Sequence, residues 1–363
     1  MRGADADTVR AAYDAGDPLP GTAGFAGPLP GVGLVRDVLG REPLFVDAAA
    51  ADPTDGAAWA TAPGPLDDPR PVPPGGVVTP EGRERAWSLP DPAPDDAVDA
   101  LDGVRNALDA RLGAVDADAV ALSGGVDSAL LAAALDRPCY VVGFPGAHDL
   151  TAAREAAERL DRELRVVEVD HDDLRRAVRA AVAATGRTNA MDVPIGALLH
   201  LVGERAAADG HERLALGQGA DELFGGYAKV AALDDRVAAD SVRGAVRETV
   251  SDLPDGLERD VVTLRAAGVD PVFPYLHDTV VEAALELPAD LLVDGDERKV
   301  ALRRVARERV GDLADRGKKA AQYGSYVARE LDRLARRAGY KRRMDDHVRR
   351  YVESVAASDA GEQ

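Results

Sequence analysis

The sequence predicts an α/β protein: a doubly wound parallel sheet with a helical C-terminal part, preceded by a small β-rich N-terminal region. From residue 97 on, short apolar segments alternate with segments of helical periodicity, which is the order of parallel strands joined by right-handed crossover helices. Residues 1–95 differ, because they are rich in Pro, Gly and Ala and contain only short apolar runs, such as 43–47 and 75–82. Such runs favour short strands separated by turns.

The individual elements follow from the spacing of apolar residues. A helix is expected where apolar residues recur every three or four positions, and a buried strand where they form a short continuous run. The expected strands are 118–122, 139–144 and 163–170. The expected helices are 98–115, 128–136, 150–160, 173–185, 280–288 and 298–310. A basic amphipathic stretch, 330–355, is expected to be a solvated helix packed on the domain, with a partner-binding helix as the alternative.

Composition limits the classes of function. The chain has 363 residues, which suits two domains, and its 46% hydrophobic residues can bury a sizeable core. Its formal net charge of −20 argues against general binding to nucleic acids or membrane surfaces, because both are anionic. Acid excess with few lysines is typical of a cytoplasmic protein from a halophilic microbe, whose acidic surface keeps it in solution at high salt.

The single cysteine and the absence of long apolar segments limit the setting further. Cys139 alone excludes an internal disulfide framework and a cysteine-rich zinc site. The N-terminus has no apolar signal region, and no later stretch approaches the roughly 18 apolar residues of a membrane span. A cytoplasmic protein without a membrane anchor is therefore expected.

The first motif that indicates chemistry is SGGVDS, residues 123–128, which lies between an expected strand and an expected helix. Its glycines let backbone N–H groups turn toward an anion, its serine hydroxyls can donate, and the helix N-terminus adds positive potential. The Walker pattern is absent, and a plain turn with Ser as the helix N-cap is the alternative. The strand–loop–helix setting favours phosphate binding through Ser123, Gly124, Gly125 and Ser128.

The second motif is LALGQGADELFGGY, residues 214–227. It crowds four glycines, a glutamine and an adjacent Asp-Glu pair behind a short apolar run. Because glycine weakens regular elements, such a cluster indicates either a loose loop or a backbone that approaches another group closely. Ligands of parallel sheets bind at the carboxyl ends of strands, so the position after the apolar run draws attention to this turn.

Together these motifs resemble those of a known family. ALSGGVDSALLAAAL is similar to the pyrophosphate-binding loop of the N-type ATP pyrophosphatases, which activate a carboxylate or amide-like oxygen as an adenylate. The second motif is similar to the signature G-x-G-x-D-E-x-F-G-G-Y of asparagine synthetases and their β-lactam synthetase relatives. The resemblance covers roughly residues 97 to 330. It continues in segments 189–202, 270–288, 298–306 (K-x-x-L-R) and 316–325, the last resembling a lysine-bearing loop that closes over the triphosphate.

The resemblance implies a fold, ligands and a reaction. The fold would be that of an adenine nucleotide alpha hydrolase-like ATP pyrophosphatase, and the ligands ATP and Mg²⁺. A carboxylate would attack the α-phosphorus of ATP, giving an acyl adenylate and pyrophosphate, and an amine or ammonia would then displace AMP. The resemblance also implies three segments: a truncated glutaminase-like region at 1–95, the synthetase domain at 96–340 and a basic helical tail at 341–363.

Residue roles are carried over from the family motifs. Asp127 and Asp221 are implied to hold Mg²⁺ on the phosphates of ATP, since this metal favours one or two carboxylates plus phosphate oxygens. Lys318, or Lys319 in the alternative register, is implied to neutralise charge on the leaving pyrophosphate. Glu222 is expected to support the following helix. The implied nucleotide-binding residues are Leu122, Ser123, Gly124, Gly125, Asp127, Ser128, Val142, Gly143, Gly217 and Gly219.

Three departures from the family pattern bear on the reaction. Full-length family members begin with a glutaminase domain whose nucleophile is the cysteine exposed after Met1 is removed, whereas Arg2 follows here, so glutamine hydrolysis is not expected. Gln218 stands where asparagine-forming members carry Glu, and an amide is a poor general base. Val272 and His277 stand where the family has Arg and Asp, and His277 is expected to be structural.

These features lead to one interpretation with two alternatives. The first is an ATP-dependent, AMP-forming amide ligase of asparagine synthetase type, which takes aspartate and ammonia, the latter free or from a separate glutaminase. Gln218 and Val272 favour a related ligase for another carboxylate or amine. A non-catalytic nucleotide-binding regulator is the third reading, and intact Asp127, Asp221 and Lys318 argue against it. The acceptor acid, the nitrogen source and the oligomeric state, a homodimer among the options, stay open.

Overall fold

The computed structural model describes residues 1–94, 96–233, 237–317 and 320–357. By their internal contacts the residues group into two compact units, each built from three stretches of chain. The mixed unit comprises Met1–Val115, Gly217–Glu258 and Phe273–Ala314, and the sheet unit comprises Asp116–Leu216, Arg259–Val272 and Asp315–Gln363. The predicted segment boundaries near residues 95 and 340 stay a prediction.

A five-stranded parallel sheet organises the sheet unit. Its strands are β8 (Ala119–Ala121), β9 (Cys139–Gly143), β10 (Leu164–Glu168), β11 (Arg213–Ala215) and β12 (Asp270–Val272). They lie in the order β10-β9-β8-β11-β12, and every neighbouring pair is parallel. This confirms the predicted α/β architecture. All of β9 is buried, as a parallel strand covered on both faces should be, which is why it reads as the continuous apolar run CYVVG.

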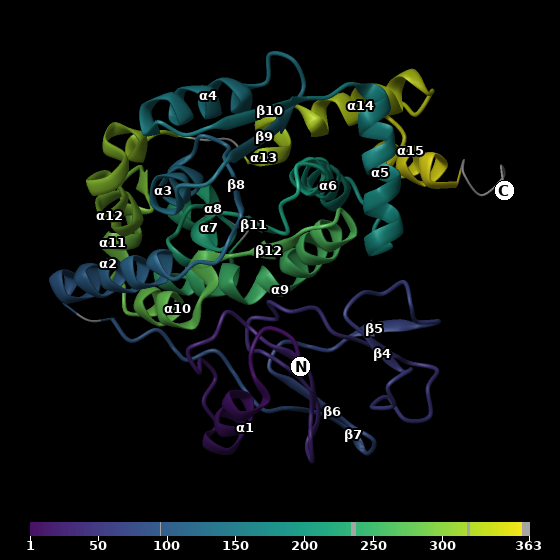
Figure 1. Cartoon of the computed structure of the whole chain (residues 1–363), viewed down its shortest axis with the longest axis vertical. Coiled ribbons are helices and arrows are strands. Elements are labelled where there is room, and N and C mark those ends of the chain that lie inside the picture. Colours follow the sequence, from purple (N-terminus) through teal and green to yellow (C-terminus); the bar gives the residue numbers. More distant parts are fainter. Residues whose placement is uncertain (95, 234–236, 318–319, 358–363) are drawn as a thin grey trace. The chain divides into compact units, whose positions relative to one another are not determined.

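Helices connect these strands in both directions from β8. Between the strands lie α3 (Val126–Leu135), α4 (His148–Leu160), α5 (His171–Thr185), α6 (Asp192–Ala208) and the end of α9 (Val242–Ala266) (Figure 1). After the last strand come α13 (Ala321–Gly324), α14 (Val327–Arg337) and α15 (His347–Ala357). The chain steps from β8 to β9 and β10, then returns to β11 on the other side of β8. Because such crossovers are right-handed, α3 and α4 cover one face, and α5 and α6 the other. Accordingly, α4 and α6 both pack against β9.

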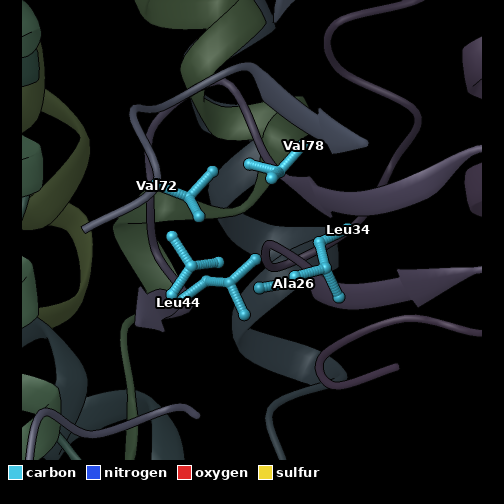
Figure 2. Close-up of a cluster of buried hydrophobic side chains, with 6 residues drawn as sticks. Ala26, Leu34, Leu44, Val72 and Val78 are labelled. Carbon is cyan, nitrogen blue, oxygen red and sulfur yellow. The ribbon is translucent and has the colours of Figure 1, made fainter. Parts of the chain in front are cut away.

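The N-terminal part of the mixed unit carries two small antiparallel sheets. Their strands are β1 (Ala26–Leu29), β2 (Gly33–Arg36), β3 (Phe45–Asp47), β4 (Trp59–Ala60), β5 (Pro69–Pro71), β6 (Gly76–Thr79) and β7 (Gly82–Arg85). One sheet has the order β1-β2-β6-β7 and the other β4-β3-β5. Figure 2 shows the buried cluster that packs between them, which consists of Ala26, Leu34, Leu44, Val46, Val72 and Val78. The predicted short strands in 43–47 and 75–82 are thus confirmed as β3 and β6.

Helices and short turns form the other elements of the mixed unit. They are α1 (Ala6–Ala15), α2 (Ala97–Gly113), α7 (Ala220–Leu223), α8 (Ala228–Ala232), the start of α9, α10 (Asp278–Leu285), α11 (Ala289–Leu292), α12 (Val300–Val310), the 3-10 turns η1 (Pro274–Leu276) and η2 (Gly311–Asp315), and the hairpin of β13 (Val293–Asp294) and β14 (Glu297–Arg298). The predicted helices in 98–115, 280–288 and 298–310 are confirmed as α2, α10 and α12. Within the described ranges, no helix has the length and apolar character needed to span a membrane.

A fully buried arginine joins the N-terminal sheets to the start of α10. Arg41 donates from Nε to Asp37 Oδ1 at 2.8 Å and from Nη1 to Asp278 Oδ1 at 2.6 Å. The backbone N–H of Thr22 donates to Asp278 Oδ2 at 2.6 Å. The three charged side chains are at most 2% exposed. Because each buried charge faces an opposite one, the network holds the N-terminal region to the segment that precedes α10.

The C-terminal stretch forms two helices, whereas its sequence pattern predicts one. α14 ends at Arg337 and α15 begins at His347. Asp332 of α14 fixes the intervening turn: it accepts from Arg342 Nη2 at 2.8 Å and from Arg336 Nε at 3.0 Å, and pairs with His347 Nε2 at 2.8 Å. These partners, Arg342 foremost, lower the pKa of the Asp332 carboxyl to about 2. α15 packs against α5 and α14, which is the packed arrangement predicted for the tail.

Replacing Asp332 with Asn is expected to lower the free energy of unfolding at neutral pH and to leave it unchanged near pH 2. The pKa of this carboxyl is lower in the folded state than its ordinary value of 3.8, so its stabilising contribution is present above about pH 4 and is lost as the pH falls through the folded-state pKa. A shift of this size corresponds to about 2 kcal/mol, which solvent screening reduces to about 1 kcal/mol. Urea unfolding of both proteins between pH 2 and pH 7 measures the difference.

Asp345→Asn is the control, because Asp345 is exposed in the same turn and lies outside the Asp332 cluster. Its free energy of unfolding should follow that of the wild type at every pH. An Asp332→Asn effect of equal size at pH 2 and pH 7 would contradict the electrostatic cause assigned here.

Candidate functional site

The loop between β8 and α3 is closed by its own serines. The hydroxyl of Ser128 donates to Gly125 O and accepts from the backbone N–H of Ser123, both at 3.2 Å. The hydroxyl oxygens of Ser123 and Ser128 lie 3.1 Å apart. Leu122, which precedes the loop, is buried. The predicted phosphate-binding residues therefore form one compact turn at the start of α3.

Gly124 is required by both close packing and backbone conformation. Its φ is +79°, and a Cβ at this position would lie 2.5 Å from the carbonyl carbon of Ala152 in α4. The next residue, Gly125, is the N-cap of α3 and offers no side-chain hydrogen bond to the first turn. The first-turn N–H groups are therefore not capped by a Ser, Thr or Asp side chain, which suits the helix start to an anion. Asp127 lies in that first turn and is partly buried.

The segment with the predicted lysines starts beside this loop. Arg316 donates from Nη1 to the carbonyl oxygen of Ala152 at 3.3 Å. Gly124 approaches the same residue of α4, so Ala152 is a shared contact of the phosphate loop and of the start of the lysine segment. Lys318 and Lys319 lie outside the described residues. Their contact with phosphate stays a prediction.

The same segment is fixed at its other end by Gly324 in α13. A Cβ at Gly324 would lie 2.0 Å from Oδ1 of Asp149, a buried residue in the first turn of α4. The carbonyl oxygen of Ser325 accepts from the backbone N–H of Phe144, directly after β9, at 3.0 Å. Both ends of the lysine segment are thus attached to the helix that follows β9 or to the end of that strand.

The residues predicted to contact adenosine lie at the carboxyl ends of neighbouring strands. Leu122 follows β8, and Val142 and Gly143 end β9, which pairs with β8. A Cβ at Gly143 would lie 3.2 Å from the Cβ of Ala147, so the strand end packs closely on the loop that follows. Parallel sheets bind ligands at this edge. Gly217 follows, in the chain, the end of β11, which pairs with β8 on its other side. Contact of these residues with a nucleoside stays a prediction.

In the mixed unit, the glycines of GQGADELFGGY permit close packing around Asp221. Gly219 has a φ of +90°, and a Cβ there would lie 2.3 Å from Cδ2 of Leu276. A Cβ at Gly226 would lie 1.9 Å from Oδ1 of Asp221 and 2.3 Å from Cε of Lys299. Since real Cβ atoms do not approach other atoms this closely, the cluster is a tightly packed turn and not a loose loop.

Asp221 forms an ion pair with Lys299, a residue to which the sequence assigned no role. Lys299 Nζ lies 2.8 Å from Asp221 Oδ1. Lys299 is 5% exposed, whereas the side chain of Asp221 is 44% exposed, so a buried ammonium stands behind a carboxylate that faces solvent. Lys299 has a φ of +60° at the N-cap of α12, a conformation that is uncommon outside glycine and is held by its surroundings. Its one sequence signal is the lysine of K-x-x-L-R.

Glu222, the acid next to Asp221, makes the contacts of a supporting residue. The hydroxyl of Tyr227 donates to Glu222 Oε1 at 2.5 Å, and the hydroxyl of Thr249 donates to the Glu222 carbonyl oxygen at 3.2 Å. Burial raises the pKa of the Glu222 carboxyl. These contacts tie α7 to the start of α9, in keeping with the support predicted for this residue. Gln218 is partly buried at the turn that leads into α7.

His277 has the contacts of a helix cap. Its Nδ1 accepts from the backbone N–H of Thr279 at 3.4 Å at the N-terminus of α10. Burial, followed by the positive charge of Arg111, lowers the pKa of the imidazole, which is therefore neutral at neutral pH. The adjacent Asp278 supplies the buried carboxylate that pairs with Arg41. These contacts fit the predicted structural role of His277.

The cysteine of this chain is not placed as a nucleophile. Cys139 is buried at the start of β9, and burial raises the pKa of its thiol to about 12, so the reactive thiolate is not formed at neutral pH. Arg2, at the position of the family nucleophile, donates from its backbone N–H to Ala26 O at 2.8 Å. The N-terminal sheets thus use this position as part of a backbone bridge.

The described residues contain no group of three or more His, Cys, Asp or Glu side chains that could hold a metal ion by themselves. The two acids predicted to bind Mg²⁺ each lie in the first turn of a helix that follows a glycine: Asp127 in α3 and Asp221 in α7. Single carboxylates suit Mg²⁺ bound to a phosphate-bearing ligand, since this ion takes most of its remaining ligands from phosphate and water.

The fold and these turns first indicate a broad class of protein. A parallel sheet with a glycine loop at a helix N-terminus is typical of α/β proteins that bind phosphate-bearing ligands. The family model for asparagine synthase matches residues 100–248 and 239–357. The chain therefore belongs to the asparagine synthase family.

Curated relatives with that name match the chain at moderate identity. A Methanocaldococcus jannaschii protein that carries the name of a glutamine-hydrolyzing asparagine synthetase is 29% identical over 294 residues, which cover 70% of this chain and 54% of that protein. A Schizosaccharomyces pombe protein with the same kind of name is 26% identical over 51% of this chain and 38% of its own length. The nodule asparagine synthetase of Pisum sativum is 28% identical over 30% of this chain and 21% of its own. The chain spans about half the length, or less, of these relatives.

Replacing Gly226 with Ala is expected to destabilise the protein by about 2–3 kcal/mol, because the added Cβ would collide with Asp221 and Lys299 in a closely packed turn. Chemical unfolding of the variant measures the loss. Gly113→Ala is the matched control: Gly113 ends α2 in the same unit, and nothing lies within 4 Å of the added Cβ. Its expected effect has the opposite sign, a gain of up to about 1 kcal/mol from better helix propensity. Equal free energies of unfolding for the Gly226 variant and the wild type would disprove the packing argument.

Proposed function

We propose that this chain is an ATP-dependent amide ligase of asparagine synthetase type that forms AMP and pyrophosphate. The observation that carries the proposal is the phosphate loop, a glycine-locked turn at the start of α3 with the lysine segment anchored beside it on α4. On this proposal a carboxylate, aspartate in the first instance, attacks the α-phosphorus of ATP to give an acyl adenylate and pyrophosphate. Ammonia then attacks the acyl carbon, and AMP leaves as the amide forms. Membership of the family supports this chemistry.

The phosphate loop would hold the pyrophosphate portion of ATP. Backbone N–H groups at the start of α3 would donate to phosphate oxygens, with further hydrogen bonds from the hydroxyls of Ser123 and Ser128. The positive end of the helix dipole adds to this attraction. Lys318, or Lys319, would neutralise the charge that develops on the leaving oxygen. The contact of Arg316 with α4 keeps the start of that lysine segment next to the loop.

Asp127 and Asp221 are the proposed protein ligands of Mg²⁺. Bound to the phosphates of ATP, this ion would reduce the repulsion between the triphosphate and the attacking carboxylate. The carboxylate of Asp221 suits this role because it is half-exposed while its Oδ1 pairs with Lys299. Lys299 thus fixes the orientation of the carboxylate and leaves one side of it accessible.

The nitrogen step is where this chain departs from asparagine-forming relatives. Gln218 does not titrate, so it cannot accept a proton from an attacking ammonium ion. On the proposed function, the nucleophile arrives as neutral ammonia or gives its proton to another group. Amide formation should therefore depend on the concentration of neutral ammonia.

A ligase for a different acid is the second candidate. Val272 ends β12 where the family pattern has Arg, and an apolar side chain cannot pair with a charged group of the acceptor acid. Pyrophosphate release measured with a panel of carboxylates, with and without ammonium, separates the candidates. Aspartate-dependent release supports the first candidate, and release with another acid supports the second. ATP binding without release for any acid would support a nucleotide-binding regulator.

The purified protein is expected to use ammonium as its nitrogen source and to release no glutamate from glutamine. The reason is chemical: the single cysteine is buried with its thiol protonated. An enzyme-coupled assay for glutamate, run beside the pyrophosphate assay, measures both. Glutamate formation above the blank without protein would overturn this assignment of the N-terminal region.

Asp127→Asn and Asp221→Asn are each expected to slow pyrophosphate release by about 10²-fold or more, since each removes a carboxylate that would hold the Mg²⁺ needed to offset the charge on the phosphates. Glu222→Gln is the matched control, because it removes the neighbouring charge while its side-chain oxygen can still accept from Tyr227. Its rate should stay within about threefold of the wild type. Melting temperatures establish that all three variants fold. A wild-type rate in Asp127→Asn would remove Asp127 from the metal site.

A further inference from the structure

A cavity of about 460 Å³ opens where α5, α14 and α15 of the sheet unit meet. These helices pack against one another, and Figure 1 shows them together around the C-terminal part of the chain. The side chains of Arg175, Arg179 and Arg337 line the cavity, together with Tyr351 and Ser354. None of these residues belongs to the phosphate loop, the lysine segment or the GQGADELFGGY turn. The cavity is therefore lined by none of the residues proposed to bind ATP.

The charge of the cavity is opposite to that of the chain. Acidic residues outnumber basic ones by 64 to 44, yet within the described ranges three arginines and no carboxylate line this cavity. Arg175 and Arg179 stand one helical turn apart on α5, so their side chains lie on the same face of that helix. Arg175 also pairs with Asp172 outside the cavity. Arginines that line one space attract an anion that enters it.

Arg337 differs from the neighbouring arginine of its helix. Both Arg336 and Arg337 lie in the last turn of α14, where positive charges are favourable. Arg336 pairs with Asp332 at 3.0 Å, whereas Arg337 forms no ion pair within the described part of the chain and lines the cavity. The helix end thus explains why a basic residue is favourable at position 337, and the side chain of Arg337 forms part of the cavity wall.

The other walls define the kind of ligand. The hydroxyl of Ser354 donates to Tyr351 O at 2.7 Å. The Tyr351 ring packs edge-on against Tyr340 with 6.0 Å between ring centres, which fixes the α15 wall. The volume lies in the range of small-molecule sites. Guanidinium groups bind carboxylate and phosphate oxygens in pairs of parallel hydrogen bonds.

We propose that this arginine-lined cavity binds a small organic oxyanion with two or more negative charges, carried by carboxylate or phosphate groups. The proposal also assigns a role to the basic C-terminal stretch. Its helices are held on the sheet unit, and their basic side chains, joined by two from α5, form a binding site for a small anion. The proposal is independent of the adenylation reaction.

Calorimetric titration of the full-length protein with citrate and with inorganic phosphate tests the site. Potassium chloride is held constant throughout, so that screening is the same in every titration. The wild type is expected to bind at least one of these probes, and Arg337→Gln and Arg179→Gln to weaken that binding at least tenfold. Binding of citrate alone identifies a polycarboxylate ligand, and binding of phosphate alone identifies a phosphate-bearing one. Binding of neither probe by the wild type overturns the proposal.

Arg350→Gln is the matched control. Arg350 is exposed on α15, has no ion pair within the described residues and does not line the cavity, so the change in net charge is the same. Its affinity for the probe should stay within twofold of the wild type. If Arg350→Gln weakens binding as much as Arg337→Gln, the effect is that of general surface charge and the site does not exist. If phosphate binds at the α3 loop and not in the cavity, Arg337→Gln leaves the affinity for phosphate unchanged. That outcome also counts against the proposal.

Melting temperature provides a second readout that does not depend on heat of binding. A ligand that binds the folded state raises the melting temperature in proportion to the logarithm of its concentration. Citrate or phosphate should therefore raise the melting temperature of the wild type and of Arg350→Gln, and raise that of Arg337→Gln much less. An equal rise in all three proteins contradicts the assignment.

Discussion

The buried guanidinium of Arg41 is the contact on which the mixed unit depends. A charge removed from water is tolerated only where opposite charges and hydrogen bonds surround it. Asp37 and Asp278 supply the charges, and the carbonyl oxygen of Leu276 accepts a further hydrogen bond from Arg41 Nη1 at 2.7 Å. Removal of one partner would leave the others buried and uncompensated. The N-terminal region thus supplies a charge network that the start of α10 requires.

The packing around Asp221 continues from this network. Leu276, whose carbonyl oxygen Arg41 binds, fills the space that a Cβ at Gly219 would occupy. Gly219 begins the short helix that carries Asp221, and Gly226 leaves room for the Asp221–Lys299 pair. Glycine is therefore required at these positions because neighbouring residues leave no room for a side chain. The Asp221 carboxylate is held by packing from several sides, which is the physical basis for a preorganised charge.

The sequence predicts best what depends on local pattern. The strand at 139–144 is recognisable because a doubly covered parallel strand must be apolar throughout, and the turn at 123–128 because two glycines stand at a strand–helix junction. Contacts between distant segments carry no such signal. The Asp221–Lys299 pair joins residues that no periodicity relates, and a lysine in a positive-φ conformation follows no propensity rule. The break between α14 and α15 likewise follows from the side-chain partners of Asp332, in a stretch whose amphipathic pattern is continuous.

Charge pairing follows one rule through most of this acidic chain. Each strongly buried cation meets a carboxylate: Arg41 meets Asp37 and Asp278, Lys299 meets Asp221, and Arg259 meets Asp192 and Asp260 at 2.7 Å. An excess of acids makes such pairing easy to satisfy. The cavity lined by Arg175, Arg179 and Arg337 gathers three cations around one space, although Arg175 also pairs with Asp172. Exposed arginines elsewhere in the chain, such as Arg165 and Arg309, pair with nearby acids, whereas those of the cavity line a common space. A small anion bound in the cavity would pair with these arginines, as carboxylates pair with the buried cations elsewhere in the molecule.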